Sequence, residues 1–264
     1  TDESQLLKTA YHKHLIKEGF YKLVTIRTLD VGGDKEISSM GAKREDNPLM
    51  GLRAIRYCLA RENVYRTQLR ASVFGDVRIM VPLITCVDEM REVRNLVRHC
   101  MEELDREGVT YNPDIQLGCM METPAASLVA DLLAAEADFF GIGTNDLTGY
   151  TMVADRGNDH VGYLCNTYDP AVLRSIRSII EAGAQAGITV GMCGEAAADP
   201  LLIPLWIAFG LNEYSVSTSS VLSIRKQIFE WTVSDAQELA GHVMRLPTAH
   251  EAHDALQEAY DRRK

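Results

Sequence analysis

Two short stretches near the middle of the chain, Cys119-Met-Met-Glu-Thr-Pro-Ala-Ala126 and Asp138-Phe-Phe-Gly-Ile-Gly-Thr-Asn-Asp-Leu147, decide its fold class. Each contains a short apolar run that ends in acidic or amide residues, and a helix-length segment separates the two runs. Apolar runs of this length, alternating with helical segments, are typical of parallel strands that are buried on both faces. The pair therefore predicts an α/β fold built on a parallel sheet.

The residues that end these two runs are candidates for a metal site. The first run, 115–121, is followed by Glu122, and the second, 139–143, is followed by Thr-Asn-Asp146. In α/β folds the chemistry lies at the carboxyl ends of the strands, where neighbouring strands bring their terminal residues together. Two carboxylates with other oxygen atoms beside them suit a hard divalent cation. We therefore predict that Glu122 and Asp146 bind Mg²⁺.

The alternation of apolar runs and helical segments extends over the whole chain. Strand candidates lie near residues 24, 53, 80, 118, 141, 191 and 215, although residues 47–55 could also be a loop that enters the start of a helix. Helices are predicted at 1–20, 56–74, 87–107, 125–136 and 169–186 and from about 221 and 234, and the polar terminal segment to Lys264 is expected to fray.

This number of strands is compatible with two architectures. Seven strands are one short of a (β/α)₈ barrel, and a doubly wound sheet would also accommodate them. Reactive polar residues at nearly every strand end favour the barrel, because there all the strand ends converge on one mouth. We therefore predict a TIM barrel over residues 1–264, with its first strand missing from the chain.

Composition excludes several classes of protein. The chain has 264 residues, of which 46% are apolar and 24% charged, so it is neither disordered nor fibrous. Its net charge of -10 argues against nucleic acid or an anionic membrane as a general partner. No apolar run reaches membrane-spanning length, and no signal-peptide core is found at the start. Six cysteines without a C-x-x-C pair indicate free thiols in a reducing compartment, so we expect a cytoplasmic protein.

Four cationic side chains and one thiol near predicted strand ends are further candidates, and each also has an ordinary structural interpretation. The Gly-Gly pair after the first strand could bring backbone N–H groups to an anion, with Arg27 and Lys35 adding charge, or form a simple tight turn. Arg53 is either half-buried and paired or a pocket cation. Arg156 lies in a sequence typical of a turn and could belong to a surface ion pair. Cys193 ends a strand, where most lone cysteines are buried and inert.

Six motifs that occur in this order along the chain resemble those of Enzyme I, the phosphoenolpyruvate–protein phosphotransferase family of the bacterial sugar phosphotransferase system. They are Arg27-Thr-Leu-Asp-Val-Gly-Gly-Asp-Lys35, Asn47-Pro with Gly51-Leu-Arg-Ala-Ile-Arg56, Met121-Glu-Thr-Pro-Ala125, Gly143-Thr-Asn-Asp-Leu147, Asp155-Arg-Gly-Asn158 and Gly191-Met-Cys-Gly-Glu195. The pyruvate phosphate dikinase and phosphoenolpyruvate synthase relatives share the barrel but do not usually show the first motif in this form.

The resemblance implies a carboxyl-terminal phosphoenolpyruvate-binding barrel domain that needs Mg²⁺ and forms a homodimer. It implies that Glu122 and Asp146 hold the metal and that Arg156 clamps the substrate carboxylate. Cys193 would lie beside the methylene carbon that gains a proton when pyruvate forms. The residues implied to surround the phosphoryl group are Arg27, Lys35, Arg53 and Asn145. Such a site is reasonable, because phosphoryl transfer requires positioning and charge neutralisation more than covalent chemistry.

The sequence also departs from the family. The family's Gly-Leu-x-Arg-Thr-Glu strand and its amino-terminal domain with the phosphorylatable His are not found, and Gly149 stands where Enzyme I usually has Gln. No candidate acceptor has a matching motif among His12, His14, His99, His160, His242, His250 and His253. We therefore expect a fragment of a phosphotransferase that passes the phosphoryl group to a His on a separate domain, from which a phosphocarrier protein receives it.

Two other functions remain open at this point. One is a Mg²⁺-dependent barrel lyase or aldolase that acts on pyruvate-like enolates and needs fewer phosphate-directed cations. The other is a non-catalytic module that senses phosphoenolpyruvate and dimerises. We expect the parent protein to be the phosphotransferase and this fragment alone to be inactive.

Overall fold

The computed structural model describes residues 23–30, 45–74 and 77–263, which form two compact units divided between Cys119 and Met120. Strands and helices alternate in both, and every strand pair described below is parallel, so the predicted α/β class is confirmed. The helix expected over residues 1–20 and the Gly-Gly loop with Lys35 lie outside the described residues.

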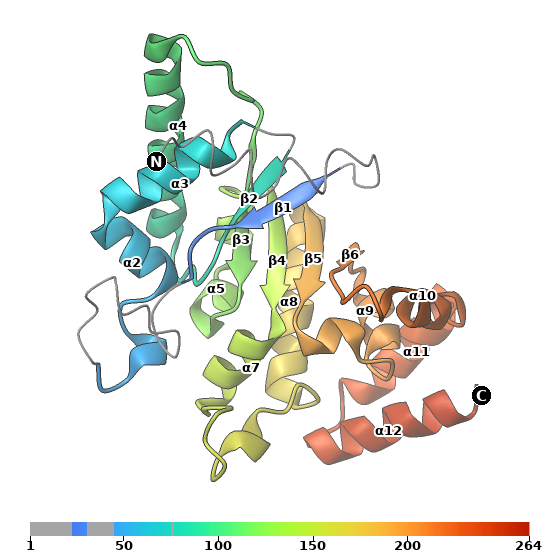
Figure 1. Cartoon of the computed structure of the whole chain (residues 1–264). Helices are drawn as coiled ribbons and strands as arrows, with labels where there is room; N and C mark the ends of the chain where they lie inside the picture. Colours follow the sequence, from blue (N-terminus) through green and yellow to red (C-terminus); the bar gives the residue numbers. More distant parts are fainter. Residues whose placement is uncertain (1–22, 31–44, 75–76, 264) are drawn as a thin grey trace. The chain divides into compact units, whose positions relative to one another are not determined.

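The first unit contains three strands and the helices that connect them. In chain order the elements are β1 (Val24–Arg27), the 3-10 helix η3 (Pro48–Met50), α2 (Ala54–Ala60), α3 (Glu62–Ser72), β2 (Val77–Val81), α4 (Val87–Glu107) and β3 (Gln116–Met121). β2 pairs with β1 and β3, so that Ile79 lies opposite both Ile26 and Leu117. Helix α3 packs along α4 (Figure 1). Because these connections are helical crossovers, β1 and β2 point their carboxyl ends in one direction.

The second unit contains three more strands. Its elements after β3 are α5 (Pro124–Leu128), α6 (Ala130–Ala134), β4 (Phe139–Gly143), α7 (Thr144–Met152), η4 (Gly162–Leu164), α8 (Pro170–Ala186), β5 (Thr189–Cys193), η5 (Glu195–Ala198), α9 (Ile203–Phe209), β6 (Glu213–Tyr214), α10 (Val221–Phe229), α11 (Val233–Val243) and α12 (Ala249–Asp261). Helix α8 packs against β4 and β5, and α11 packs against α9 (Figure 1).

Strand β5 has one fully buried face and one half-buried face. Val190 and Met192 are each 1% exposed, whereas Thr189, Gly191 and Cys193 are half-buried. In the register of β4 with β5, Gly143 lies opposite Cys193. Cross-strand partners share a face of the sheet. A glycine therefore stands beside the cysteine at the carboxyl ends of two neighbouring strands.

Of the two interpretations of residues 47–55, the helix start is the one observed, and the strand candidate near residue 53 is wrong. Arg53 has extended backbone, with φ -133° and ψ 168°, but it is the N-cap of α2. Its apolar neighbours Ala54 and Ile55 belong to the buried face of this helix, which also includes Tyr57 and Cys58. A short apolar run does not distinguish a strand from the buried turn of a helix. The described part of the chain consequently has six strands rather than seven.

Other differences concern helices. The terminal segment expected to fray forms α12, because Thr248 caps it by accepting a bond from the Glu251 N–H, and because Leu256 is 1% exposed. Helix α7, which includes Asp146, was not predicted. The helices predicted at 56–74 and 125–136 each break in the middle, and the last strand is shorter than predicted.

Several predictions are confirmed closely. Strand 139–143 and helix 87–107 have the predicted bounds, and α8 begins after Asp169, whose carboxylate accepts a bond from the Ala171 N–H. All six cysteines are free thiols, as expected. Within the described residues, none of the helices combines the length and the apolar character that spanning a membrane requires.

Candidate functional site

Glu122 directly follows β3 and folds over the carboxyl end of β4. Its side chain is 3% exposed. A Cβ atom added to Gly143 would lie only 2.4 Å from Oε2 of Glu122, which is a clash. A side chain at position 143 would therefore displace this carboxylate, which stands where β4 leads into α7.

The first turn of α7 is tied to the end of β5. Thr144 Oγ1 donates a hydrogen bond to the Cys193 carbonyl at 3.0 Å, and Asn145 Oδ1 accepts one from the Glu195 N–H at 3.1 Å. Gly194 between them has φ +94°, and a Cβ there would lie 2.3 Å from Thr144 Oγ1. Glycine is thus required at 194 both by conformation and by space. These bonds direct the Asn145 oxygen toward β5, so its NH₂ group is the end left to donate to a ligand.

Cys193 is half-buried at the end of β5, with its thiol directed at the neighbouring strand. Its Sγ donates to the Ile142 carbonyl at 3.4 Å. The side chain is therefore half-buried and hydrogen-bonded rather than fully buried. A positioned S–H group can serve as a proton donor.

Glu122 and Asp146 are the carboxylates that could contribute to a metal site. Glu122 is buried and Asp146, in the first turn of α7, is half-buried. Among the residues that the structure describes, no cluster of three or more His, Cys, Asp or Glu side chains could hold a metal. Mg²⁺ does not need such a cluster, because it commonly takes one or two carboxylates together with water and substrate phosphate.

Arg156 lies in an exposed turn after α7. Asp155 Oδ1 accepts a bond from the Gly157 N–H at 2.8 Å, which is the turn chemistry expected from the sequence. Burial and the Asp155 charge raise the pKa of the nearby Cys165 thiol, and the Arg156 charge opposes that rise. Arg156 therefore exerts its charge near Cys165.

Cys165 lines a pocket of about 390 Å³. The pocket is formed by the 162–168 segment together with Glu195, Ala196, Asp199 and Leu202. Tyr168 donates its hydroxyl to Asp199 Oδ2 at 2.5 Å, and burial together with this carboxylate raises the pKa of Tyr168. The pocket adjoins the candidate site through Glu195, whose N–H is bound to Asn145.

In the first unit, Arg27 and Arg53 meet at one carboxylate. Arg53 Nη2 lies 3.0 Å from Asp30 Oδ1 and 3.1 Å from Oδ2, and Arg53 Nε lies 3.3 Å from Oδ1. Arg27 Nη1 lies 3.7 Å from Asp30 Oδ2. The Arg53 side chain is 5% exposed and the Arg27 side chain 44% exposed. Of the two interpretations of Arg53, the buried and paired one is therefore the one observed.

Comparison with known proteins assigns a family. The family model described as "PEP-utilising enzyme, PEP-binding domain" matches residues 3–233, which is most of the chain. The chain belongs to this family. It is 45% identical over 244 residues to a phosphoenolpyruvate-protein phosphotransferase of Geobacillus stearothermophilus, covering 91% of this chain and 42% of the relative. It is 42% identical over 255 residues to the protein of that name from Priestia megaterium, covering 95% and 44%.

This PEP-binding domain spans less than half the length of these relatives. Among solved structures, a citrate lyase from Burkholderia xenovorans LB400 matches with a TM-score of 0.45 and 19% identity, covering 76% of this chain and 69% of that one. A likeness this weak decides neither the architecture nor the function. The family assignment therefore depends on sequence similarity alone.

Within its second unit, the PEP-binding domain brings together several residues that the sequence predicted. Glu122 folds over Gly143 at the start of α7, and Asn145 and Cys193 are connected through the bonds between α7 and β5. Lys35 lies outside the described residues.

Three participants were missed by sequence reasoning: Asp30, Thr144 and Gly194. All three lie inside the quoted motifs, which was the available signal. The described histidines are exposed except His253, which is half-buried.

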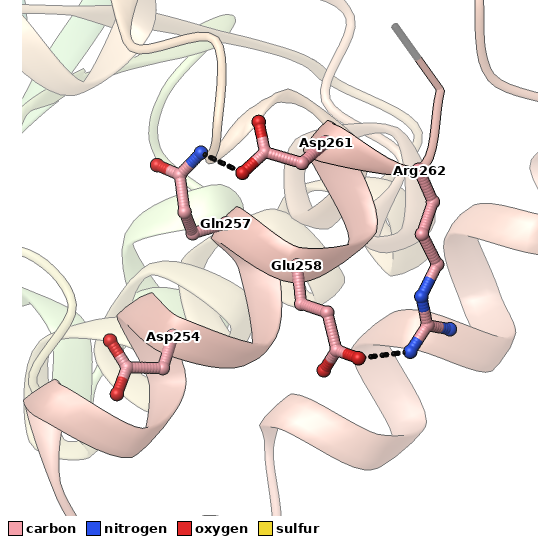
Figure 2. A pocket seen from close by; sticks show the side chains of 5 residues that line it. All are labelled: Asp254, Gln257, Glu258, Asp261 and Arg262. Atoms are coloured by element: carbon pink, nitrogen blue, oxygen red, sulfur yellow. Dashed lines mark hydrogen bonds and ion pairs between the residues drawn. The ribbon is translucent and has the colours of Figure 1, made fainter.

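A second hollow, of about 590 Å³, lies on α12, and none of the predicted site residues lines it (Figure 2). Its lining is mainly acidic and is made by Asp254, Gln257, Glu258, Asp261 and Arg262. Gln257 Nε2 donates to Asp261 Oδ2 at 3.0 Å, and Arg262 pairs with Glu258, so the polar groups satisfy one another along the helix. The hollow has the character of a solvated helix face rather than of a ligand site.

Proposed function

We propose that this domain binds phosphoenolpyruvate with Mg²⁺ as part of a phosphoenolpyruvate–protein phosphotransferase. The observation that carries the proposal is the junction of β4, α7 and β5, where Glu122, Asn145 and Cys193 are held by glycine-dependent close contacts. Membership of the PEP-binding family supports the choice of ligand.

In this proposal each residue has one task. Glu122 and Asp146 hold Mg²⁺, which when bound neutralises charge on the phosphoryl oxygens. Asn145 donates its amide to the phosphoryl group, to which the resemblance also assigns Arg27, Lys35 and Arg53. Arg156 binds the carboxylate, for which a guanidinium offers two parallel N–H donors. Its charge near the 162–168 segment and its exposed position are compatible with this task.

The chemistry proposed for the parent protein is the transfer of the phosphoryl group to a His on another domain. The bond between phosphorus and the enol oxygen breaks, a bond from phosphorus to the His nitrogen forms, and the enolate of pyruvate remains. Cys193 then gives its thiol proton to the methylene carbon, which yields pyruvate, and the thiolate recovers a proton from solvent. A thiol has a reference pKa of about 8.5, so it is protonated near neutral pH and can act as this donor.

The remaining expectations concern the longer protein. We propose a (β/α)₈ barrel, a homodimer, a phosphocarrier protein as the phosphoryl acceptor of the parent protein, and a cytoplasmic location. Eight strands would require two strands besides the six described here. The relatives, more than twice as long as the matched segment, have chain enough to supply them.

Calorimetry of phosphoenolpyruvate binding, with and without Mg²⁺, tests the proposal on the chain itself. We expect binding that depends on Mg²⁺ and that Glu122→Gln weakens by roughly tenfold or more, because a hydrogen bond or ligand bond to a charged group contributes about 1.5–3 kcal/mol. Glu213→Gln is a matched control, since Glu213 also folds over a strand glycine, with Oε2 3.3 Å from a Cβ built on Gly191.

Three outcomes would contradict the proposal. No binding of phosphoenolpyruvate would remove it. An equal loss in Glu213→Gln would assign the effect to charge alone rather than to a metal ligand. Pyruvate that binds as tightly as phosphoenolpyruvate would favour the lyase or aldolase alternative, because that reaction does not need a phosphoryl group.

A further inference from the structure

The carboxylate of Asp30 lies at the carboxyl end of β1, between two arginines. Asp30 follows the strand by three residues, and its side chain is 4% exposed. Arg53 approaches it with both Nε and Nη2, in three contacts of 3.0–3.3 Å. Arg27, on the strand itself, approaches the second carboxylate oxygen at 3.7 Å. One buried anion thus contacts two guanidinium groups.

The surrounding backbone keeps this cluster in place. Arg53 is the extended N-cap residue of α2, so its side chain leaves the helix before the first turn. Cys58, in the same helix, donates its thiol to the Leu29 carbonyl at 3.6 Å. Burial and then the Asp30 charge raise the pKa of Cys58 to about 12, so this thiol stays neutral and adds no competing anion. Helix α2 and the end of β1 are therefore fixed to each other beside Asp30.

The two arginines differ in what they can do. Arg53 is almost fully buried, and its charge is balanced by Asp30. Arg27 is nearly half exposed, and one of its terminal nitrogens, Nη1, forms an ion pair with the same carboxylate at 3.7 Å, so Asp30 attracts one end of a guanidinium that solvent also reaches. A guanidinium held from one side keeps its remaining N–H donors in a fixed direction, which favours bidentate binding of an oxyanion.

We propose that Asp30 is a positioning residue for phosphoryl binding. Its carboxylate orients the guanidinium of Arg27, and the buried Arg53 balances the charge of that carboxylate. This inference rests on the proposed function, in which these arginines act on the phosphoryl group of phosphoenolpyruvate. The inference adds an acidic residue, Asp30, to a phosphoryl-binding group whose charged members are otherwise cations.

Removal of the Asp30 charge has two opposite effects on an anionic ligand. It makes the local potential more positive, which by itself would strengthen phosphate binding. It also removes the carboxylate that contacts both Arg27 and the buried Arg53, which loosens the position of the donors. The proposal requires the second effect to be larger, so the sign of the change in affinity decides the matter.

The test is Asp30→Asn in the full-length phosphotransferase, with KM for phosphoenolpyruvate and kcat measured separately by exchange between pyruvate and phosphoenolpyruvate. We expect KM to rise by roughly tenfold, because a charge-assisted hydrogen bond contributes about 1.5–3 kcal/mol, whereas kcat should change much less. Asp30→Glu keeps the charge but displaces the guanidinium groups in a buried space, so it should raise KM as well. If Asp30→Asn does not fold, Asp30→Glu decides.

Glu103→Gln is the matched control. Glu103 also lies between two arginines, since Arg66 Nη2 contacts one of its oxygens and Arg70 Nη1 lies 3.2 Å from the other. That cluster belongs to α3 and α4 rather than to a strand end. The control should lower the unfolding temperature and leave KM unchanged.

A double-mutant cycle with Arg27→Ala tests whether Asp30 acts through Arg27. If it does, Asp30→Asn should change KM much less in the Arg27→Ala background than in the parent. Unchanged or lower KM in a folded Asp30 variant would overturn the positioning role, and so would fully additive effects in the cycle. If the full-length protein without substitutions does not use phosphoenolpyruvate, the proposed function and this inference are both overturned. That result needs no variant, so it is distinguished from a failure of the inference alone.

Discussion

The thiol of Cys193 is held by the neighbouring strand rather than by its own. Its Sγ donates to the Ile142 carbonyl at 3.4 Å, and its own carbonyl accepts a bond from Thr144. Both contacts connect β5 to the segment that carries Asn145 and Asp146. A proton donor at this position would keep its direction relative to those residues, as general acid catalysis requires.

Cys193→Ser in the full-length protein should preserve phosphoenolpyruvate affinity and slow exchange between pyruvate and phosphoenolpyruvate. A hydroxyl is a much weaker acid than a thiol, and a positioned general acid contributes about 10²–10⁴-fold. We therefore expect exchange to fall by at least about 10²-fold, measured with isotopically labelled pyruvate.

Cys165→Ser is the matched control for that experiment. Cys165 is also half-buried, and its Sγ also donates to a backbone carbonyl, that of Ala154, at 3.3 Å. This variant should keep most of the exchange rate. Normal exchange in Cys193→Ser would return Cys193 to the role of a packing residue.

At the residue scale, sequence reasoning identified which side chains to examine but not what they contact. It left Arg53 open between a paired residue and a pocket cation, because the deciding partner, Asp30, is 23 positions away. It could not show that Gly143 makes room for Glu122, since that contact joins two strand ends in space. Residue type and motif order are local, whereas pairing and burial depend on the fold.

At the scale of elements, the end of α7 carries backbone strain. Val153 is the C-cap residue, with φ +52° and ψ +42°, and its side chain is 85% exposed. A β-branched residue is a genuine outlier in this left-handed region, where glycine is favoured. Because the side chain buries little, the strain has no evident compensation from packing.

Val153→Gly should therefore raise the unfolding temperature, by an amount corresponding to about 1 kcal/mol. Thermal unfolding followed by circular dichroism measures it. Val233→Gly is a matched control, because Val233 is 58% exposed and begins α11 without a positive φ. The control should not be stabilised, since no left-handed conformation is relieved there and glycine is a poorer helix former than valine. A lower unfolding temperature for Val153→Gly would show that the strain is offset elsewhere.

Elements with strong local signals were predicted, and those defined by tertiary contacts were not. Helix α4 has apolar residues at helical spacing and Gly108 at its end, so its bounds followed from the sequence. Helix α7 begins with Thr-Asn-Asp146 and buries only Thr144, Leu147 and Thr148, so it lacks an apolar stripe to reveal it. The strand predicted near residue 53 failed for the reverse reason, because its apolar run belongs to a buried helical turn.

At the scale of the whole molecule, the parallel α/β class followed from the sequence, whereas the number of strands did not. The error in the strand count does not affect the predicted site, because Glu122, Asp146 and Cys193 lie on or directly after strands that are present. An α/β fold tolerates such an error, since each strand and its following loop form one unit of the pattern.

The stability of the protein at low pH depends on carboxylates that are paired in the folded state. The chain carries 37 acidic and 27 basic residues, so acidic side chains outnumber the cationic side chains that could pair with them. Burial by itself would raise the pKa of Glu103, but the hydrogen bonds and charges of Arg66 and Arg70 outweigh burial and lower it. A carboxylate with a lowered folded-state pKa stabilises the protein above its unfolded-state pKa of about 4.3, and this contribution is lost as the pH falls through the folded-state value.

Glu103→Gln should consequently have a pH-dependent cost. At pH 7 the variant should unfold at a lower temperature than the parent, by an amount corresponding to about 1 kcal/mol or less, because solvent screens a network that is partly exposed. Below about pH 4.3 the difference should shrink toward zero, because the parent carboxylate becomes protonated as well. Unfolding temperatures of both proteins between pH 7 and pH 3.5 measure it. A difference that stays constant over this range would mean that Glu103 contributes through packing and neutral hydrogen bonds, and that the α3–α4 contact does not depend on its charge.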